Sequence, residues 1–173
     1  MPTWLEGDDW SRMFRDFRQS VFRLETRDLY TMPDEEDEFR RFLEGEKPPA
    51  DLWYPWLDTV VQAVQAGKSV QRVHVVTSPL SSYIRYEAEW GYVFNIQVGE
   101  DIRILDLATT PDPGLPEQDF FLFDDTNVVL MHYRDDGTQI GRELLDAPDI
   151  ARYVEWKRMA LETSTPFVDY YQA

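Results

Sequence analysis

Cysteine is absent from this 173-residue chain, and histidine occurs only twice. The lack of cysteine excludes a disulfide framework, a thiolate metal site and a cysteine nucleophile. No apolar run approaches the ~20 residues that a bilayer span requires, and acids already stand among the first ten residues, where a signal peptide would be basic and then apolar. We therefore expect no membrane segment and no signal peptide. A cytoplasmic location fits a chain without cysteine.

Positive charge is also scarce, because 17 Lys and Arg face 33 Asp and Glu, for a formal net charge of −16. A field of this sign repels phosphate backbones and anionic lipids. Direct nucleic-acid binding and membrane binding are therefore not expected. The charge is compatible with solubility alone, and also with a surface complementary to a basic protein partner.

Catalytic motifs are missing as well. The chain contains no G-x-S-x-G, P-loop, G-x-G-x-x-G or H-E-x-x-H pattern. His74 and His132 each stand inside an apolar, strand-like run, where a single histidine is more often a core residue than a catalyst. The sequence predicts no metal site, no cofactor and no catalytic residue.

The residues that are present describe a folded protein, since 43% are hydrophobic and 14% aromatic. We predict one α+β domain over 1–173, in which a mixed, mostly antiparallel sheet packs against helices. Residues 1–46 form a helix–strand–helix portion and 51–173 the main α+β body. The stiff segment 47–50, Lys-Pro-Pro-Ala, joins them.

The strand–turn–helix unit at 71–91 organises the expected fold. Residues 72–77 predict a buried strand, and 80–90 a helix that ends at Gly91. Segment 92–98 predicts a short strand. A further strand follows at 102–105.

Three other segments have equally clear patterns. Apolar and charged residues alternate over 21–30, which predicts a half-buried strand with one wet, zwitterionic face. Asp51 is expected to cap a helix whose apolar stripe starts at Leu52. Residues 120–145 predict a three-stranded antiparallel meander, with a hairpin at Asp136-Gly137.

Charged residues near the expected strand ends are the candidate binding site. Arginine and carboxylate groups at one edge of a sheet can bind a small polar ligand through bidentate contacts. The same groups can instead form a structural ion-pair network, and both interpretations stay open. The candidates are Arg85, Glu87, Glu100, Asp101, Arg103 and Asp119.

Three stretches carry a family resemblance: 72–87 (RVHVVTSPLSSYIRYE), 99–103 (GEDIR) and 119–124 (DFFLFD). Together they resemble an actinobacterial family of small uncharacterised proteins, a domain of unknown function. The resemblance implies an association with helix-turn-helix regulators, and hence a regulatory accessory role.

A weaker resemblance is to the phospholipase D-like fold, on the strand pair at 120–133. That superfamily uses H-x-K-x-x-x-x-D. Here His132 is followed by Arg134 in place of the lysine and Gln139 in place of the aspartate. The resemblance therefore implies a non-catalytic version of the fold.

Two functions follow as expectations. The first is a non-enzymatic, acidic regulatory protein that binds a basic partner, such as a DNA-binding regulator, with Glu100, Asp101 and the acidic run 34–38 as contacts. The second is a small-polar-ligand binder or hydrolase with a site built from Arg85, Arg103, Glu100 and Asp119. Homo-oligomers are compatible with either.

Overall fold

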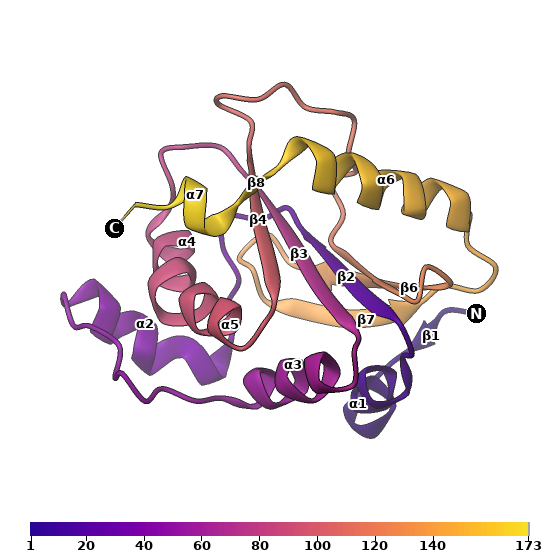
Figure 1. Cartoon of the computed structure of the whole chain (residues 1–173), viewed down its shortest axis with the longest axis horizontal. Coiled ribbons are helices and arrows are strands. Elements are labelled where there is room, and N and C mark those ends of the chain that lie inside the picture. The colour runs from indigo at the N-terminus through magenta and orange to yellow at the C-terminus, as the bar shows by residue number, and fades with distance from the viewer. Residues whose placement is uncertain (173) are drawn as a thin grey trace.

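Within residues 1–172, which the computed structural model describes, eight strands form one mixed sheet (Figure 1). The strands are β1 (Thr3–Trp4), β2 (Ser20–Glu25), β3 (Ser69–Val76), β4 (Asp101–Asp106), β5 (Phe120–Phe123), β6 (Asn127–Tyr133), β7 (Gln139–Leu144) and β8 (Thr165–Pro166). Their order is β1-β7-β6-β5-β2-β3-β4-β8. β3 pairs in parallel with both β2 and β4, and the remaining neighbours are antiparallel. The predicted α+β class and the mostly antiparallel sheet are confirmed.

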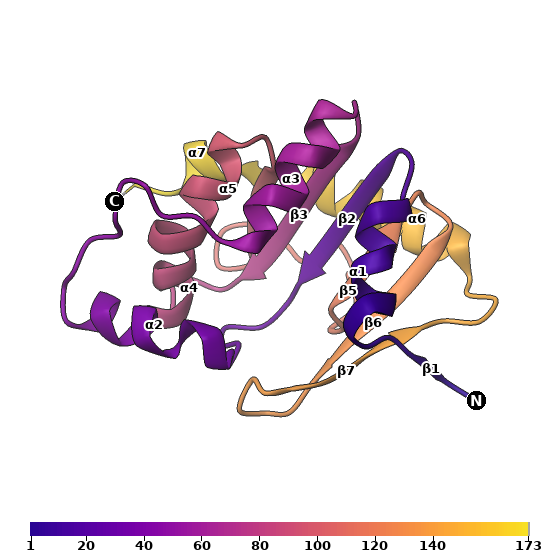
Figure 2. The same ribbon diagram turned by 90° about the horizontal axis from the view of Figure 1, so that it is seen from below.

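Helices cover both faces of this sheet. They are α1 (Gly7–Asp16), the 3₁₀ turn η1 (Pro33–Glu35), α2 (Glu36–Leu43), α3 (Pro55–Gln65), α4 (Ser82–Glu87), the π-helix η2 (Ala88–Tyr92), α5 (Val93–Gln97), α6 (Ile150–Thr163) and α7 (Phe167–Tyr170). Figure 2 shows α1 and α3 on one face, with α6 behind the sheet. No helix within 1–172 is both long enough and apolar enough to cross a bilayer.

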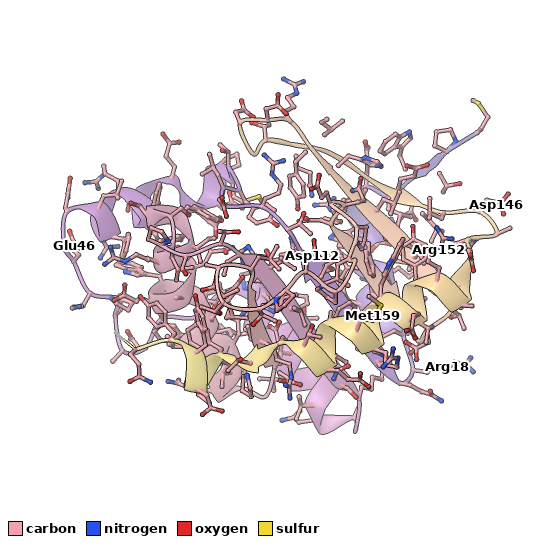
Figure 3. The ribbon with its side chains drawn as sticks, turned by 90° about the horizontal axis from the view of Figure 1, so that it is seen from above. Arg18, Glu46, Asp112, Asp146, Arg152 and Met159 are labelled. Carbon is pink, nitrogen blue, oxygen red and sulfur yellow. The ribbon has the colours of Figure 1, made fainter. Side chains whose placement is uncertain are left out.

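The two faces have different cores. On the α6 face, Phe22, Leu24 and Phe120 are fully buried and pack with Ala160. Burying each of these large side chains stabilises the fold by about 1.5–3 kcal/mol. Figure 3 shows α6 running across this face, with Arg152 and Met159 labelled on it. The opposite face packs against α1, α3 and the α4–η2–α5 run, and it carries most of the buried polar groups.

The meander β5–β6–β7 forms as predicted, and Gly137 adopts φ +87° in its second turn. One helix boundary differs from the prediction. α3 begins at Pro55 rather than after Asp51, because proline, which has no N–H, fits the first turn of a helix. α6 is capped by Asp149, whose side chain accepts from the Arg152 N–H.

Gly91 does not end the central helix. The helical run continues from Ser82 to Gln97, so the expected strand at 92–98 is wrong. Glycine disfavours a helix interior only by about 1 kcal/mol, and burial of Trp90 and Tyr92 on either side outweighs that cost. Because the run passes Gly91 as a π-helix, it contains the kind of local helix insertion that is common at functional sites.

Candidate functional site

A cavity of about 460 Å³ lies on the face of the sheet that carries α1 and α3. Its lining comes from β2, β3, β5, β6 and β7, from the start of α3, from α1 and α2, and from α4 and η2. Segments that are far apart in the sequence therefore meet around one space. Three arginines, several carboxylates and a large share of tyrosine and tryptophan rings face it.

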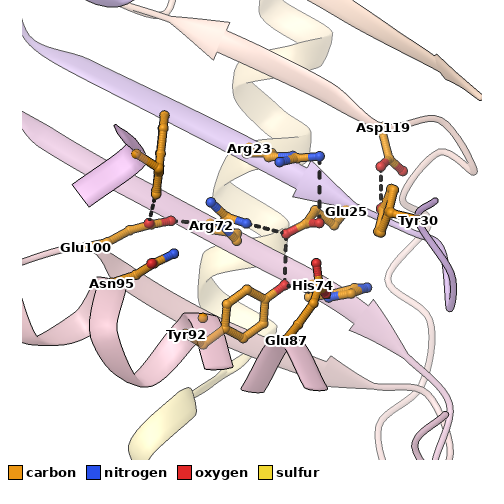
Figure 4. A network of polar contacts seen from close by, with 12 residues as sticks. Arg23, Glu25, Tyr30, Arg72, His74, Glu87, Tyr92, Asn95, Glu100 and Asp119 are labelled. Atoms are coloured by element: carbon orange, nitrogen blue, oxygen red, sulfur yellow. Dashed lines mark hydrogen bonds and ion pairs between the residues drawn. The ribbon is translucent and has the colours of Figure 1, made fainter. Parts of the chain in front are cut away.

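Arg72 of β3 and Glu25 of β2 line the cavity on its sheet side, which we call its floor. Figure 4 shows the polar contacts between them and their neighbours. The Arg72 Nη1 donates to Glu25 Oε1 at 2.9 Å, and its Nε donates to Glu100 Oε2 at 2.8 Å. Glu100 also accepts from the Trp56 Nε1 at 2.7 Å. All three charged side chains are almost fully buried. Burial of an ion pair is tolerated where, as here, further hydrogen bonds satisfy the remaining groups.

Strand register explains why two arginines meet here. Arg23 of β2 is the direct neighbour of Arg72 in the parallel β2–β3 pair. Like charges in such positions repel, and Glu25 compensates because it lies between them, 3.7 Å from the Arg23 Nη2. Burial by itself raises the pKa of Glu25, but the guanidinium groups of Arg23 and Arg72 outweigh it and hold the pKa well below its usual range.

The expected wet face of β2 is therefore wrong. Glu25 is 1% exposed, and the Arg23 side chain is only 18% exposed. The alternation was correctly located, but helices cover both faces of the sheet at β2, with α6 on one side and α1, α3 and the α4–η2–α5 run on the other (Figure 2).

Glu87, at the end of α4, closes the network from the helical side. The Tyr92 hydroxyl lies 2.9 Å from Glu25, 3.2 Å from Glu87 and 2.8 Å from the His74 Nδ1. Burial, and then the charges of Glu25 and Glu35, raise the pKa of Glu87 well above its ordinary value. The raised pKa favours the protonated form of Glu87, in which the carboxyl proton is a donor within a group rich in acceptors.

A metal ion is poorly matched to this cluster. Glu25, His74 and Glu87 place ligand atoms within 4.8 Å of one another. The His74 Nε2 faces the Arg27 carbonyl oxygen at 2.7 Å and so carries the hydrogen, which leaves Nδ1 to face the cluster. However, Nδ1 already lies 2.8 Å from the Tyr92 hydroxyl. Glu25 already pairs with Arg72. A divalent cation would have to compete with a buried guanidinium for its main carboxylate ligand.

The solvent end of the cavity is acidic and aromatic. Asp34, Glu35 and Glu38 belong to its lining and come from η1 and α2. Tyr83 donates to Glu35 at 2.7 Å, and burial raises the pKa of Glu35. The acidic run 34–38, a candidate contact for a basic partner, therefore also borders the cavity.

Three buried donors have no hydrogen-bond partner among residues 1–172: the Nε of Arg23, the Nε1 of Trp90 and the Nε of Arg142. All three residues line the same cavity. A buried donor without an acceptor costs about 1–3 kcal/mol, so it is unusual for three to gather in one place.

The structure does not bring the six candidate residues together. Glu87 lines the cavity. Glu100 is not part of the lining, but it accepts a hydrogen bond from the Arg72 Nε. Asp119 accepts from the backbone N–H of Thr26 at 2.9 Å and from the Tyr30 hydroxyl, and it does not line the cavity.

The other three candidates lie elsewhere. Arg103 pairs in register with Val73, whose side chain is in the core on the α6 face, so Arg103 and Asp101 lie on the face opposite Arg72. They contact each other at 3.4 Å. Arg85 is exposed on α4.

Sequence reasoning missed Arg23, Glu25 and Arg142 as cavity residues. A usable signal existed in β2 and β3, where charged residues alternate with apolar ones in both strands: Arg23 and Glu25 in one, Arg72 and His74 in the other. Two such strands side by side place their charges on a common face. Arg142 had no comparable signal, because β7 reads as an ordinary surface strand.

His132 lies apart from this network. Its Nε2 contacts Glu143 at 2.8 Å, and its ring meets Trp4 edge-on at 5.6 Å. It is part-exposed near the edge of the sheet rather than in the core, so the expectation of a core histidine holds for the fully buried His74 only.

Residues 8–172 match the model of a domain of unknown function, DUF6879. The chain belongs to this family. No curated protein sequence matches the chain. The expected resemblance to a family described as a domain of unknown function is thereby confirmed.

Solved structures show related folds at low sequence identity. Nuc from Salmonella typhimurium, a phospholipase D family member, is similar at a TM-score of 0.50 and 11% identity, over 95% of this chain and 91% of that one. TrmBL2, an archaeal chromatin protein, has a TM-score of 0.46 and 12% identity, over 91% of this chain and 49% of that one. The likeness to Nuc supports the expected phospholipase D-like fold, and it shows the fold alone.

Proposed function

We propose that this DUF6879 protein is a non-enzymatic binding protein that holds a small polar ligand in the cavity between the sheet, α2 and η2. The observation that carries the proposal is the gathering of three unpartnered buried donors in one cavity. Protein atoms cover each of these donors, so a ligand that offers acceptors would satisfy them after a small shift of the neighbouring side chains. The volume of about 460 Å³ suits a small molecule, since ligand pockets span about 300–1,000 Å³.

The walls support binding rather than chemistry. The six tyrosine side chains of the lining offer large apolar faces with polar tips (Tyr30, Tyr54, Tyr83, Tyr86, Tyr92 and Tyr133). Such rings bury much area at little cost in conformational entropy. The π-helix supplies further lining residues, Trp90 and Gly91. The helical run therefore departs from regular α-helix geometry where it borders the cavity.

A non-enzymatic role agrees with the state of both histidines. His74 is enclosed, with one ring nitrogen against a carbonyl oxygen and the other against a tyrosine. His132 is followed by Arg134 and Gln139 where the phospholipase D motif has lysine and aspartate. These departures support a non-catalytic version of the fold.

Filling the cavity tests the proposal. Gly91 lines it, and a Cβ at this position would meet only the Tyr54 hydroxyl, at 4.0 Å. We expect Gly91→Leu to fold and to lose binding. A library of polar metabolites is screened by thermal shift, and hits are confirmed by native mass spectrometry. Gln97→Leu, exposed on the same helical run, is the control. Hits that bind Gly91→Leu as well as the wild type would refute the cavity as the site.

The second candidate is the acidic accessory protein that binds a basic partner, such as a helix-turn-helix regulator of an actinobacterial cell. It is supported by the net charge of −16 and by exposed acids on α2. A cytoplasmic location belongs to this proposal, and homo-oligomers stay compatible with it.

Charge reversal separates the second candidate from the first. Glu36→Lys with Asp37→Lys reverses two exposed acids that do not line the cavity. We expect it to weaken partner capture in a nuclease-treated pull-down at low salt. Glu117→Lys with Asp146→Lys reverses two exposed acids elsewhere and is the control. Equal capture of the partner by the wild type and by both double variants would show that the exposed acids of α2 do not contact it.

A further inference from the structure

The three arginines of the cavity are unequally neutralised. Arg72 has a carboxylate at 2.9 Å and another at 2.8 Å. Arg23 has only Glu25 at 3.7 Å, and it also donates to the Tyr133 hydroxyl at 3.2 Å. Arg142 has no carboxylate within ion-pair distance among residues 1–172. The Nε atoms of both Arg23 and Arg142 are buried without an acceptor.

Strand register places Arg23 and Arg142 on the same face of the sheet. Arg23 pairs with Phe121, and Phe121 pairs with Val129. Met131, two residues further along β6, points the same way as Val129 and pairs with Arg142. Both arginines therefore extend over the same strands, β5 and β6, from opposite sides.

The two guanidinium groups lie over two aromatic rings that contact each other. Arg142 lies 5.0 Å from the Trp10 ring centroid, and Arg23 lies 5.0 Å from that of Phe121. The two rings meet edge-on at 5.2 Å. Ring contacts favour a cation, but they leave its N–H donors without acceptors. Burial, followed by a contribution from the charge of Arg23, lowers the pKa of Arg142.

An anionic group would supply what both side chains lack. A guanidinium presents its donors as a planar fork that fits a carboxylate or phosphate in bidentate fashion. The acids at the solvent end of the cavity, Asp34, Glu35 and Glu38, come from η1 and α2 rather than from the strands that carry the two arginines. Glu25 is paired with Arg72. The structure offers two such forks, with Tyr133 and Gln139 also in the lining.

We infer that Arg23 and Arg142 form an anion subsite that binds a carboxylate or phosphate group of the ligand, an inference that rests on the proposed small-molecule function. The fully neutralised Arg72 belongs to the floor and not to this subsite. Ligands of the cavity are then organic acids or phosphate esters with an aromatic or otherwise apolar body that packs on the rings.

Four probes that share one ring test the charge preference: benzoate, phenyl phosphate, benzamide and benzylamine. Binding is measured by calorimetry at constant ionic strength, on the full chain. We expect benzoate or phenyl phosphate to bind the wild type, and to bind Arg23→Gln and Arg142→Gln at least tenfold more weakly. Arg103→Gln, on the opposite face, should bind as the wild type does. Comparison of the two anions separates a carboxylate site from a phosphate site.

The other possible results distinguish a failure of the anion subsite from a failure of the proposed small-molecule function. Binding of benzylamine or benzamide but of neither anion overturns the anion subsite and leaves the cavity function standing. Anion binding that persists in both arginine variants overturns the subsite in the same way. If no probe binds while the metabolite screen yields a neutral or cationic ligand, only this inference fails; if the screen is also empty, both fail.

Stability without ligand gives an independent readout. Because the charge of Arg142 lacks a carboxylate, Arg142→Gln should leave the urea midpoint of unfolding unchanged or raise it. Arg72→Gln should lower that midpoint. An Arg142→Gln protein that is as unstable as Arg72→Gln would show a structural role and overturn the inference.

Discussion

Replacement of Glu87 by glutamine tests the buried network most directly. The Glu87 side chain is only 12% exposed, and its pKa is raised by burial and by the charges of Glu25 and Glu35. The unfolded chain loses this proton near the ordinary value of 4.5, whereas the folded chain keeps it. Stability contributed by the protonated group is therefore complete below pH 4.5 and is lost as the pH rises toward the folded pKa.

The size of the effect follows from this interval. Neutral pH lies about 2.5 pH units above 4.5, and each unit is worth about 1.4 kcal/mol, so the carboxyl group costs at most about 3.4 kcal/mol at pH 7. Glutamine is uncharged at every pH and keeps an acceptor for Tyr92. We expect Glu87→Gln to raise the free energy of unfolding by about 1–3 kcal/mol at pH 7 and by little at pH 4.5. Glu25 has the opposite pH dependence, but both proteins contain it, so it cancels.

Urea unfolding followed by tryptophan fluorescence at pH 4.5, 6 and 7.5 measures the difference. Glu89→Gln is the control, since Glu89 lies on η2 and accepts from the Tyr171 hydroxyl away from the network. The reasoning fails if Glu87→Gln is destabilised at pH 7.5. That result would mean that Glu87 is ionised and paired with a charged His74, whose Nδ1 is 3.6 Å away.

Three further substitutions, Gly45→Ala, Gly137→Ala and Arg72→Met, probe two turns and the floor of the cavity. Gly137 and Gly45 have nearly equal φ, +87° and +88°, but a Cβ on Gly137 would lie 2.8 Å from the Leu29 carbonyl oxygen, and one on Gly45 would meet nothing within 4 Å. We expect Gly45→Ala to lower the free energy of unfolding by about 1–2 kcal/mol, because of backbone strain. Gly137→Ala should lower it by about 2–4 kcal/mol, because overpacking adds to the strain. Equal losses of stability in thermal unfolding would contradict this. Arg72→Met leaves two buried carboxylates without their cation and should cost about 3–5 kcal/mol, and a urea midpoint like that of the wild type would count against the floor as described.

The likeness to Nuc concerns the fold alone. In this chain Arg134 and Gln139 stand where the phospholipase D motif has lysine and aspartate. Gln139 belongs to the lining of the cavity, as do Arg23 and Arg142. The ligand site that we propose is this cavity and not the position of His132.

Local pattern was sufficient for much of the fold. The alternation in 120–145 and the glycine at 137 fix a meander, because hairpin register depends on residues close in sequence. It failed at Gly91, where the cost of glycine in a helix is smaller than the gain from burying Trp90 and Tyr92. Propensity is a local quantity, whereas that burial depends on the whole sheet.

The sequence by itself determined the fold class, the meander and the exclusion of thiol chemistry and of the searched catalytic motifs, since each depends on composition or on neighbouring residues. Only the tertiary structure decided the site. Arg23 and Glu25 have the pattern of a solvated face, and that face is buried because α1, α3 and the α4–η2–α5 run pack over it. Arg142 shares this face with Arg23 through the register of three strand pairs. Strand periodicity says which side chains share a face, but strand pairing decides which charges lie side by side there, and helix packing decides what covers them.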